Sequence, residues 1–152
     1  GAEVADITEK SLRDVLEVRK ALEELAVQLA CEKITEAEIE ELKKAAEDFK
    51  KILKSNDVTQ IAEADVHFHD IIYMATDNQK LIQLLSNLRE QMYRYRVEYL
   101  KRESVYPKLI AEHEEIIHFI QEKNKTQAAE MVSRHIDNQV DAVMAVIRNK
   151  QN

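Results

Sequence analysis

The chain has 152 residues, a formal net charge of −7, 45% hydrophobic residues and 34% charged residues. This mixture fits a soluble globular domain and excludes a disordered chain, and the acidic charge argues against direct binding to nucleic acid. With one Gly and one Pro there are too few turn residues for a sheet, so we expect long helices joined by short links.

Residues 1–152 are predicted to form a single domain, because the length suits one domain and no linker interrupts the pattern. The lone cysteine, Cys31, cannot form an internal disulfide, which suits the reducing cytoplasm. No apolar stretch is long enough to cross a bilayer. Gly1 has no preceding Met, and we interpret it as a cloning remnant on a fragment of a longer protein.

Six helices are predicted in chain order. The first runs from Thr8 or Ser11 to residue 33, on an apolar stripe that includes Leu25. Thr35 and Glu38 form a capping box for the second helix, which ends near residues 55–56. The remaining helices are expected over residues 57–76 with Asp57 as N-cap, 79–101, 107–123 with Pro107 in the first turn, and 126–149. Short links between them predict an all-α antiparallel bundle.

Four polar residues interrupt the apolar stripes of three of these helices. Asp65 shares the inner face of the third helix, and His69 follows one turn later. His113 and His135 stand in the stripes of the fifth and sixth helices. An isolated carboxylate is costly to bury unless it is paired or bound to a metal. One Asp and three His suit Zn, Ni, Fe, Cu or Mn, with positions open to further ligands.

Each of these residues also has an ordinary structural interpretation. A histidine on an apolar face is commonly a hydrogen-bonded core residue, and an aspartate there commonly pairs with an arginine. The other two histidines, His67 and His118, lie off the stripes and are expected in solvent. Glu115 and His118 match one element of a di-iron bundle, but the sequence lacks the second such pair.

The chain resembles a known family over essentially its full length. This family is the FadR-type C-terminal (FCD) domain of GntR-family transcription regulators. The residues that carry the resemblance are V-R-K-A-L-E at 18–23, A-D-V-H-F-H at 64–69, T-D-N-Q-K-L at 76–81, E-H at 112–113 and R-H-I at 134–136. In the third motif Gln79 replaces the proline that the family usually has. The order and spacing of the motifs are more specific than any one of them.

The resemblance implies a ligand-sensing domain. In metal-binding members an Asp and three His, here Asp65, His69, His113 and His135, hold a divalent metal, which we expect to be Zn or Ni, with Fe or Mn as alternatives. A small organic acid completes the coordination, and an arginine of the first helix, here Arg19, helps to bind it. A guanidinium can hold a carboxylate through two parallel hydrogen bonds.

The resemblance further implies a cytoplasmic homodimer that binds DNA through an N-terminal winged helix-turn-helix, which is absent from this chain. For Arg19 the alternative is a surface ion pair with Glu23, four residues on. In the helix over 79–101, Arg96 is predicted to face inwards as a second carboxylate clamp. Asn138, one turn beyond His135, is expected to contact the effector or to support the metal ligands.

Two other functions remain open from the sequence. A metal with open positions could activate water in a hydrolase-like enzyme, but no nucleophile motif accompanies it. A metal-free helical interaction module is the second alternative. That module predicts that Asp65 pairs with an arginine inside the bundle.

Overall fold

The computed structural model describes residues 8–151, with side chains up to residue 149. Over this range the chain forms seven α-helices, two 3₁₀ turns and no strand, which confirms the all-α prediction. The helices are α1 (Glu9–Lys33), α2 (Glu36–Ile52), α3 (Val58–Ala75), α4 (Gln79–Asn87), α5 (Arg89–Leu100), α6 (Tyr106–Gln121) and α7 (Lys125–Gln151). The 3₁₀ turn η1 (Leu53–Ser55) follows α2 directly, and the 3₁₀ turn η2 (Glu103–Val105) leads directly into α6.

Local capping explains where several helices begin. Thr35 and Glu38 form the predicted capping box at the start of α2. The Asp57 carboxylate accepts hydrogen bonds from two backbone N–H groups in the first turn of α3. Pro107 stands in the first turn of α6, where a missing N–H has no cost. These predictions from the sequence are confirmed.

Sharp reversals are made without glycine. Asn56, Asp77 and Lys123 have positive φ angles of 57°, 49° and 58° and lie in the links before α3, α4 and α7. Asn and Asp tolerate this left-handed region better than most residues, because their short polar side chains hydrogen-bond locally. The links therefore stay short although the described chain contains no glycine.

The prediction of a single helix over residues 79–101 is wrong, because the helix is interrupted at Leu88 and forms α4 and α5. The two halves bury their apolar residues against different partners. Leu81 and Leu85 of α4 pack in a small cluster with Ala26 of α1. Tyr95 of α5 joins the main core, where α5 contacts α3 and α7. One straight helix could not reach both clusters.

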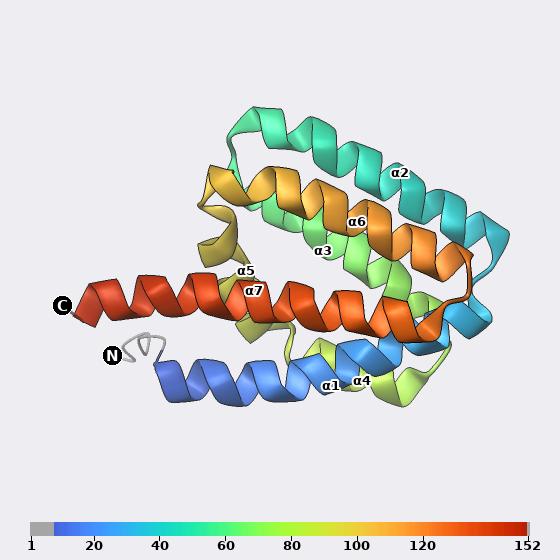
Figure 1. The fold of residues 1–152 in the computed structure, drawn as a ribbon, viewed down its shortest axis with the longest axis horizontal. Coiled ribbons are helices and arrows are strands. Elements are labelled where there is room, and N and C mark those ends of the chain that lie inside the picture. Colours follow the sequence, from blue (N-terminus) through green and yellow to red (C-terminus); the bar gives the residue numbers. More distant parts are fainter. Residues whose placement is uncertain (1–7, 152) are drawn as a thin grey trace.

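The longest helices, α1 and α7, lie side by side and antiparallel (Figure 1). Helices α2, α3 and α6 pack together over them, and an ion pair between Glu9 and Arg148 joins the start of α1 to the end of α7 at 2.9 Å. Leu25, predicted on the inner stripe of α1, is 43% exposed, which corrects that prediction. None of the described helices is long and apolar enough to cross a bilayer.

A group of polar side chains lies inside this apolar core. Among the described residues the buried polar side chains are Arg19, Glu23, Asp65, His69, Thr76, Arg96, Glu112, His113, His135 and Gln139. Arg19 is the largest of the side chains that are fully buried. Apart from Thr76, they belong to one connected site.

Candidate metal and effector site

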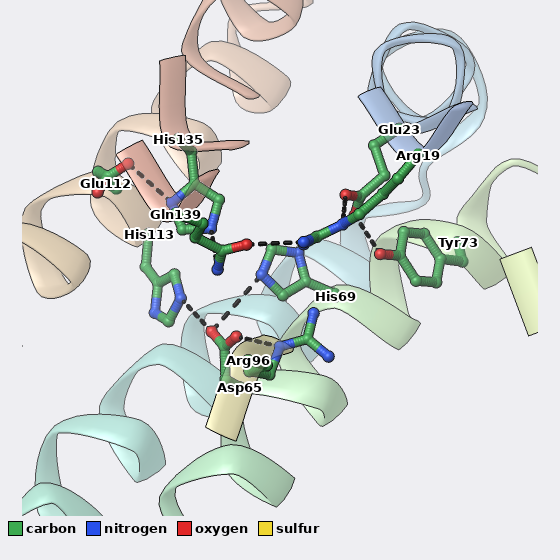
Figure 2. Close-up of polar contacts among 10 residues, drawn as sticks. All are labelled: Arg19, Glu23, Asp65, His69, Tyr73, Arg96, Glu112, His113, His135 and Gln139. Carbon is green, nitrogen blue, oxygen red and sulfur yellow. Dashed lines mark hydrogen bonds and ion pairs between the residues drawn. The ribbon is translucent and has the colours of Figure 1, made fainter. Parts of the chain in front are cut away.

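Three of the four predicted metal ligands meet at one point. Asp65 and His69 project from successive turns of α3, and His113 reaches them from α6 (Figure 2). The Oδ1 atom of Asp65 lies 2.9 Å from His113 Nε2 and 3.5 Å from His69 Nε2. A ligand atom of each residue lies within 4.8 Å of the other two. Ligands about 2.0–2.2 Å from one metal ion, at tetrahedral or octahedral angles, are about 3.0–3.4 Å apart, so the spacing fits a shared cation.

His135, the fourth predicted ligand, lies beside this group rather than in it. Its ring is stacked near that of His69, with 5.8 Å between the ring centroids. Its Nδ1 atom is 2.8 Å from Oε2 of Glu112, and both side chains are buried. A carboxylate behind an imidazole is the arrangement that commonly orients a metal-ligating histidine.

Hydrogen bonds from Arg19 define which nitrogen of His135 carries its proton. Arg19 Nη1 donates to Oε1 of Gln139 at 2.7 Å, and because arginine only donates, the amide oxygen must face it. The amide nitrogen of Gln139 then faces His135 Nε2 at 3.4 Å, so Nε2 accepts. The Nδ1–H group accordingly donates to Glu112. This tautomer leaves on Nε2 the lone pair that a metal would need.

Arg96 is buried and faces inwards, as predicted. Its Nε atom donates to Asp65 Oδ2 at 2.7 Å. Burial alone would raise the pKa of Asp65, but His69, His113 and Arg96 together hold that pKa well below its usual range. The buried Arg96–Asp65 pair is also what the metal-free interaction module predicts. Arg96 already neutralises Asp65, so the burial of this carboxylate does not by itself require a metal.

The buried carboxylates of the site outnumber its guanidinium groups. Two guanidinium groups, Arg19 and Arg96, accompany three buried carboxylates, Glu23, Asp65 and Glu112. Burial lowers the pKa of His69 and outweighs the opposite influence of Asp65. The guanidinium groups therefore match two of the three carboxylates. A divalent ion among the histidines would add positive charge beside the third.

Arg19 forms the ion pair with Glu23 that the sequence allowed, but in the core rather than on the surface. Arg19 Nε lies 2.5 Å from Glu23 Oε2, and the hydroxyl of Tyr73 donates to the other carboxylate oxygen (Figure 2). Burial would raise the pKa of Glu23, but Arg19, His69, Tyr73 and Arg96 lower it to about 2. Burial and the Glu23 charge raise the pKa of Tyr73 well above its usual value. Arg19 Nη2 is buried and has no hydrogen-bond partner among the described residues.

Asn138 is half-buried, and the neighbouring Gln139 makes the contacts with Arg19 and His135. Four contributors to the site were not predicted from the sequence: Glu23, Tyr73, Glu112 and Gln139. Three of them follow a predicted site residue by four positions, so they share its helix face. Glu112 follows Leu109 by three positions and precedes Ile116 by four, a signal that could have placed it inwards. His67 and His118 are exposed, as expected.

A narrow cavity lies among the buried polar side chains of the site. Its polar wall consists of Glu23, His69, Tyr73 and His135, and apolar side chains close the remainder. The volume of about 10 Å³ holds roughly one water molecule. An organic acid therefore needs either a rearrangement of these side chains or additional space next to them.

Comparison with known proteins supports the fold and indicates the family. A family model described as the FCD domain matches residues 14–138. The chain is 31% identical over 140 residues to the HTH-type transcriptional regulator LutR of Bacillus subtilis, covering 88% of this chain and 63% of the relative. It is 25% identical over 148 residues to the gluconate operon transcriptional repressor of the same organism, covering 94% and 61%. It is 24% identical to a third B. subtilis regulator, YdhC, covering 97% and 66%.

Solved structures share the fold at lower sequence identity. The Streptococcus agalactiae GntR structure superposes with a TM-score of 0.74 at 22% identity, over 91% of this chain and 62% of that one. E. coli McbR/YncC also gives a TM-score of 0.74, at 19% identity, over 98% and 69%. This chain belongs to the FCD domain family, which confirms the resemblance read from its motifs.

The relatives bear on function as well as fold. All three curated relatives are named as transcriptional regulators or repressors, which argues against the hydrolase-like enzyme that the sequence left open. The chain spans slightly less than two thirds of the length of each of them.

Proposed function

We propose that this chain is the sensing domain of a GntR-family transcription regulator and holds a divalent metal through Asp65, His69, His113 and His135. The observation that carries the proposal is the convergence of two imidazole Nε2 atoms on one oxygen of Asp65. The tautomer of His135 and the excess of buried carboxylates over guanidinium groups add to it. Three imidazoles and one carboxylate favour Zn or Ni, with Fe or Mn as alternatives.

A small organic acid is the proposed effector. A bound divalent ion would supply positive charge and open positions for carboxylate oxygens. Arg19 is the second anchor in this proposal, since one of its buried N–H groups has no hydrogen-bond partner among the described residues and is free to donate to an anion. Arg96 offers another such group. Asn138, half-buried one turn beyond His135, is the proposed polar contact of the effector.

An effector bound at the unpaired N–H of Arg19 would also pull on the contacts that this guanidinium makes now. These contacts tie α1 to α7 through Gln139 and α1 to α3 through Glu23 and Tyr73. An acid that draws Arg19 away loosens these links and shifts the population of bundle arrangements, by no more than its difference in affinity for them. In the proposed whole protein, a cytoplasmic homodimer, this shift alters DNA binding by an attached domain.

Metal analysis tests the proposal directly. Protein purified without chelator is measured by native mass spectrometry and elemental analysis, which detect metal and retained ligand together. His113→Ala and His135→Ala should each lower the metal content, and His118→Ala, at an exposed histidine of α6, is the control. Metal content that is equal in all four proteins would rule the site out.

A metal-free interaction module is the second candidate, and the buried Arg96–Asp65 pair favours it. In that case the histidines are core residues and the purified protein contains no stoichiometric metal. Addition of Zn²⁺ or Ni²⁺ would then leave the thermal unfolding temperature unchanged. A rise in that temperature, absent in His113→Ala, would favour the metal-binding sensor.

A further inference from the structure

A second, larger cavity opens beside the metal site, between α3, α4 and α5. We call it the α3–α5 cleft, and it has a volume of about 180 Å³. Its inner end is formed by His69 and Arg96, which also belong to the site described above, and Tyr73 stands between the two spaces. The cleft therefore provides the additional space that the narrow cavity lacks.

The inner end of the cleft carries an unused hydrogen-bond donor. Arg96 is 3% exposed and gives its Nε–H to Asp65, but its Nη2 atom is buried without a hydrogen-bond partner among the described residues. In Figure 2 the far end of this guanidinium points away from Asp65. An unpaired buried N–H of a charged group is costly, and a carboxylate oxygen would satisfy it.

The walls of the cleft are apolar. Ile82 and Leu85 of α4 face it from one side, and Met92 of α5 and Met74 of α3 from others. Met74 is 60% exposed, so part of the apolar lining is open to solvent. A polyhydroxylated acid would leave its hydroxyls without partners against these walls, whereas an apolar body would be well accommodated.

The outer rim is charged. Asp70 and Arg89 form an ion pair across it at 2.9 Å, joining α3 to α5. Arg89 and Arg96 give the lining two positive charges against the one of Asp70, although the whole chain is acidic. This local excess favours an anion at the entrance as well as at the inner end.

We propose that the α3–α5 cleft binds the apolar body of a monocarboxylic effector whose carboxylate lies at Arg96 and the metal site. An apolar cavity of about 150 Å³ accepts benzene, so the cleft suits an acid with an aromatic or branched body of about that size. The inference rests on the proposed sensor function and adds the chemical class of its ligand, an apolar acid rather than a hydroxy acid.

Calorimetric titration of the Zn²⁺-loaded chain tests the ligand class. The probes are benzoate, 4-methylpentanoate, acetate and gluconate. The first two should bind about tenfold or more tightly than acetate, because their bodies leave water for the apolar walls. Gluconate should bind no better than acetate. If all four bind equally, or gluconate binds best, the proposal is overturned while the sensor function stands.

Two variants locate the binding in the cleft. Ile82→Asn should weaken benzoate about tenfold and leave acetate and metal content unchanged. Leu84→Asn, on the same helix but 50% exposed and outside the lining, should change nothing. Ser86→Trp, at an exposed lining residue, narrows the cleft without removing a core side chain and should also weaken benzoate. Benzoate affinity unchanged in both Ile82→Asn and Ser86→Trp overturns the assignment.

The outcomes separate this inference from the function on which it rests. Benzoate binding that depends on Ile82 but is the same with and without metal supports the cleft and contradicts the metal-dependent sensor. Acetate binding that needs metal and Arg19, with no gain from an apolar body, supports the sensor and contradicts the cleft. Failure of every acid to bind the loaded protein contradicts both.

Discussion

Replacement of Glu112 by Gln tests whether the carboxylate behind His135 supports a metal ligand. Glu112 Oε2 lies 2.8 Å from His135 Nδ1 in the core, and Gln keeps the shape of the side chain while removing its charge. Loss of such a carboxylate typically lowers metal affinity by about 10–100-fold. In free energy this is about 1.4–2.7 kcal/mol less stabilisation by saturating metal.

The effect on thermal stability should have opposite signs with and without metal. In a domain of this size about 1 kcal/mol shifts Tm by roughly 2–4 °C, so the rise in Tm on metal addition should shrink by about 3–11 °C. Without metal the variant should be at least as stable as the parent, because two buried guanidinium groups then face two carboxylates.

Competition with a chromophoric chelator measures the affinity, and thermal unfolding with and without Zn²⁺ measures the shift in Tm. Glu115→Gln, at an exposed position on α6, is the matched control and should behave like the parent. The reasoning would be refuted by an unchanged metal affinity in Glu112→Gln. An equal loss of Tm with and without metal would refute it as well, since the carboxylate would then serve only the fold.

Three further predictions concern stability. Asp57→Ala removes the cap of α3 and should lower the free energy of unfolding in urea by about 1 kcal/mol; no change would mean that water replaces the cap. The pKa of Glu23 is about 2 in the folded chain against an ordinary 4.5, so its ionised form stabilises the fold above about pH 4.5 and this contribution is lost as the pH falls towards 2. In Glu23→Gln the loss of stability over that range should be smaller by up to about 3 kcal/mol, measured by urea unfolding at each pH. Arg19→Met strands the Glu23 carboxylate and should cost about 3–5 kcal/mol, most of it recovered when Glu23→Gln is added; equal loss in the single and double variants would argue against the pair.

Much of this molecule follows from its sequence alone, because the relevant interactions are local. Capping by Thr35 and Asp57 involves residues two or three positions apart, and the scarcity of Gly and Pro limits the chain to helices. Helical periodicity directs His69, His113 and Arg96 inwards, since a face is defined by spacing along a single helix. The motifs around these residues were also sufficient to indicate the family.

The tertiary structure decided which buried groups meet. Asp65 pairs with Arg96, 31 residues away, and His135 pairs with Glu112 rather than joining the other histidines directly. The break at Leu88 accompanies two separate apolar clusters, one that includes α4 and one that includes α5, which the helical pattern did not reveal. Periodicity shows that a side chain is buried but not what it faces, and in a low-dielectric core the facing charge decides whether a carboxylate needs a metal.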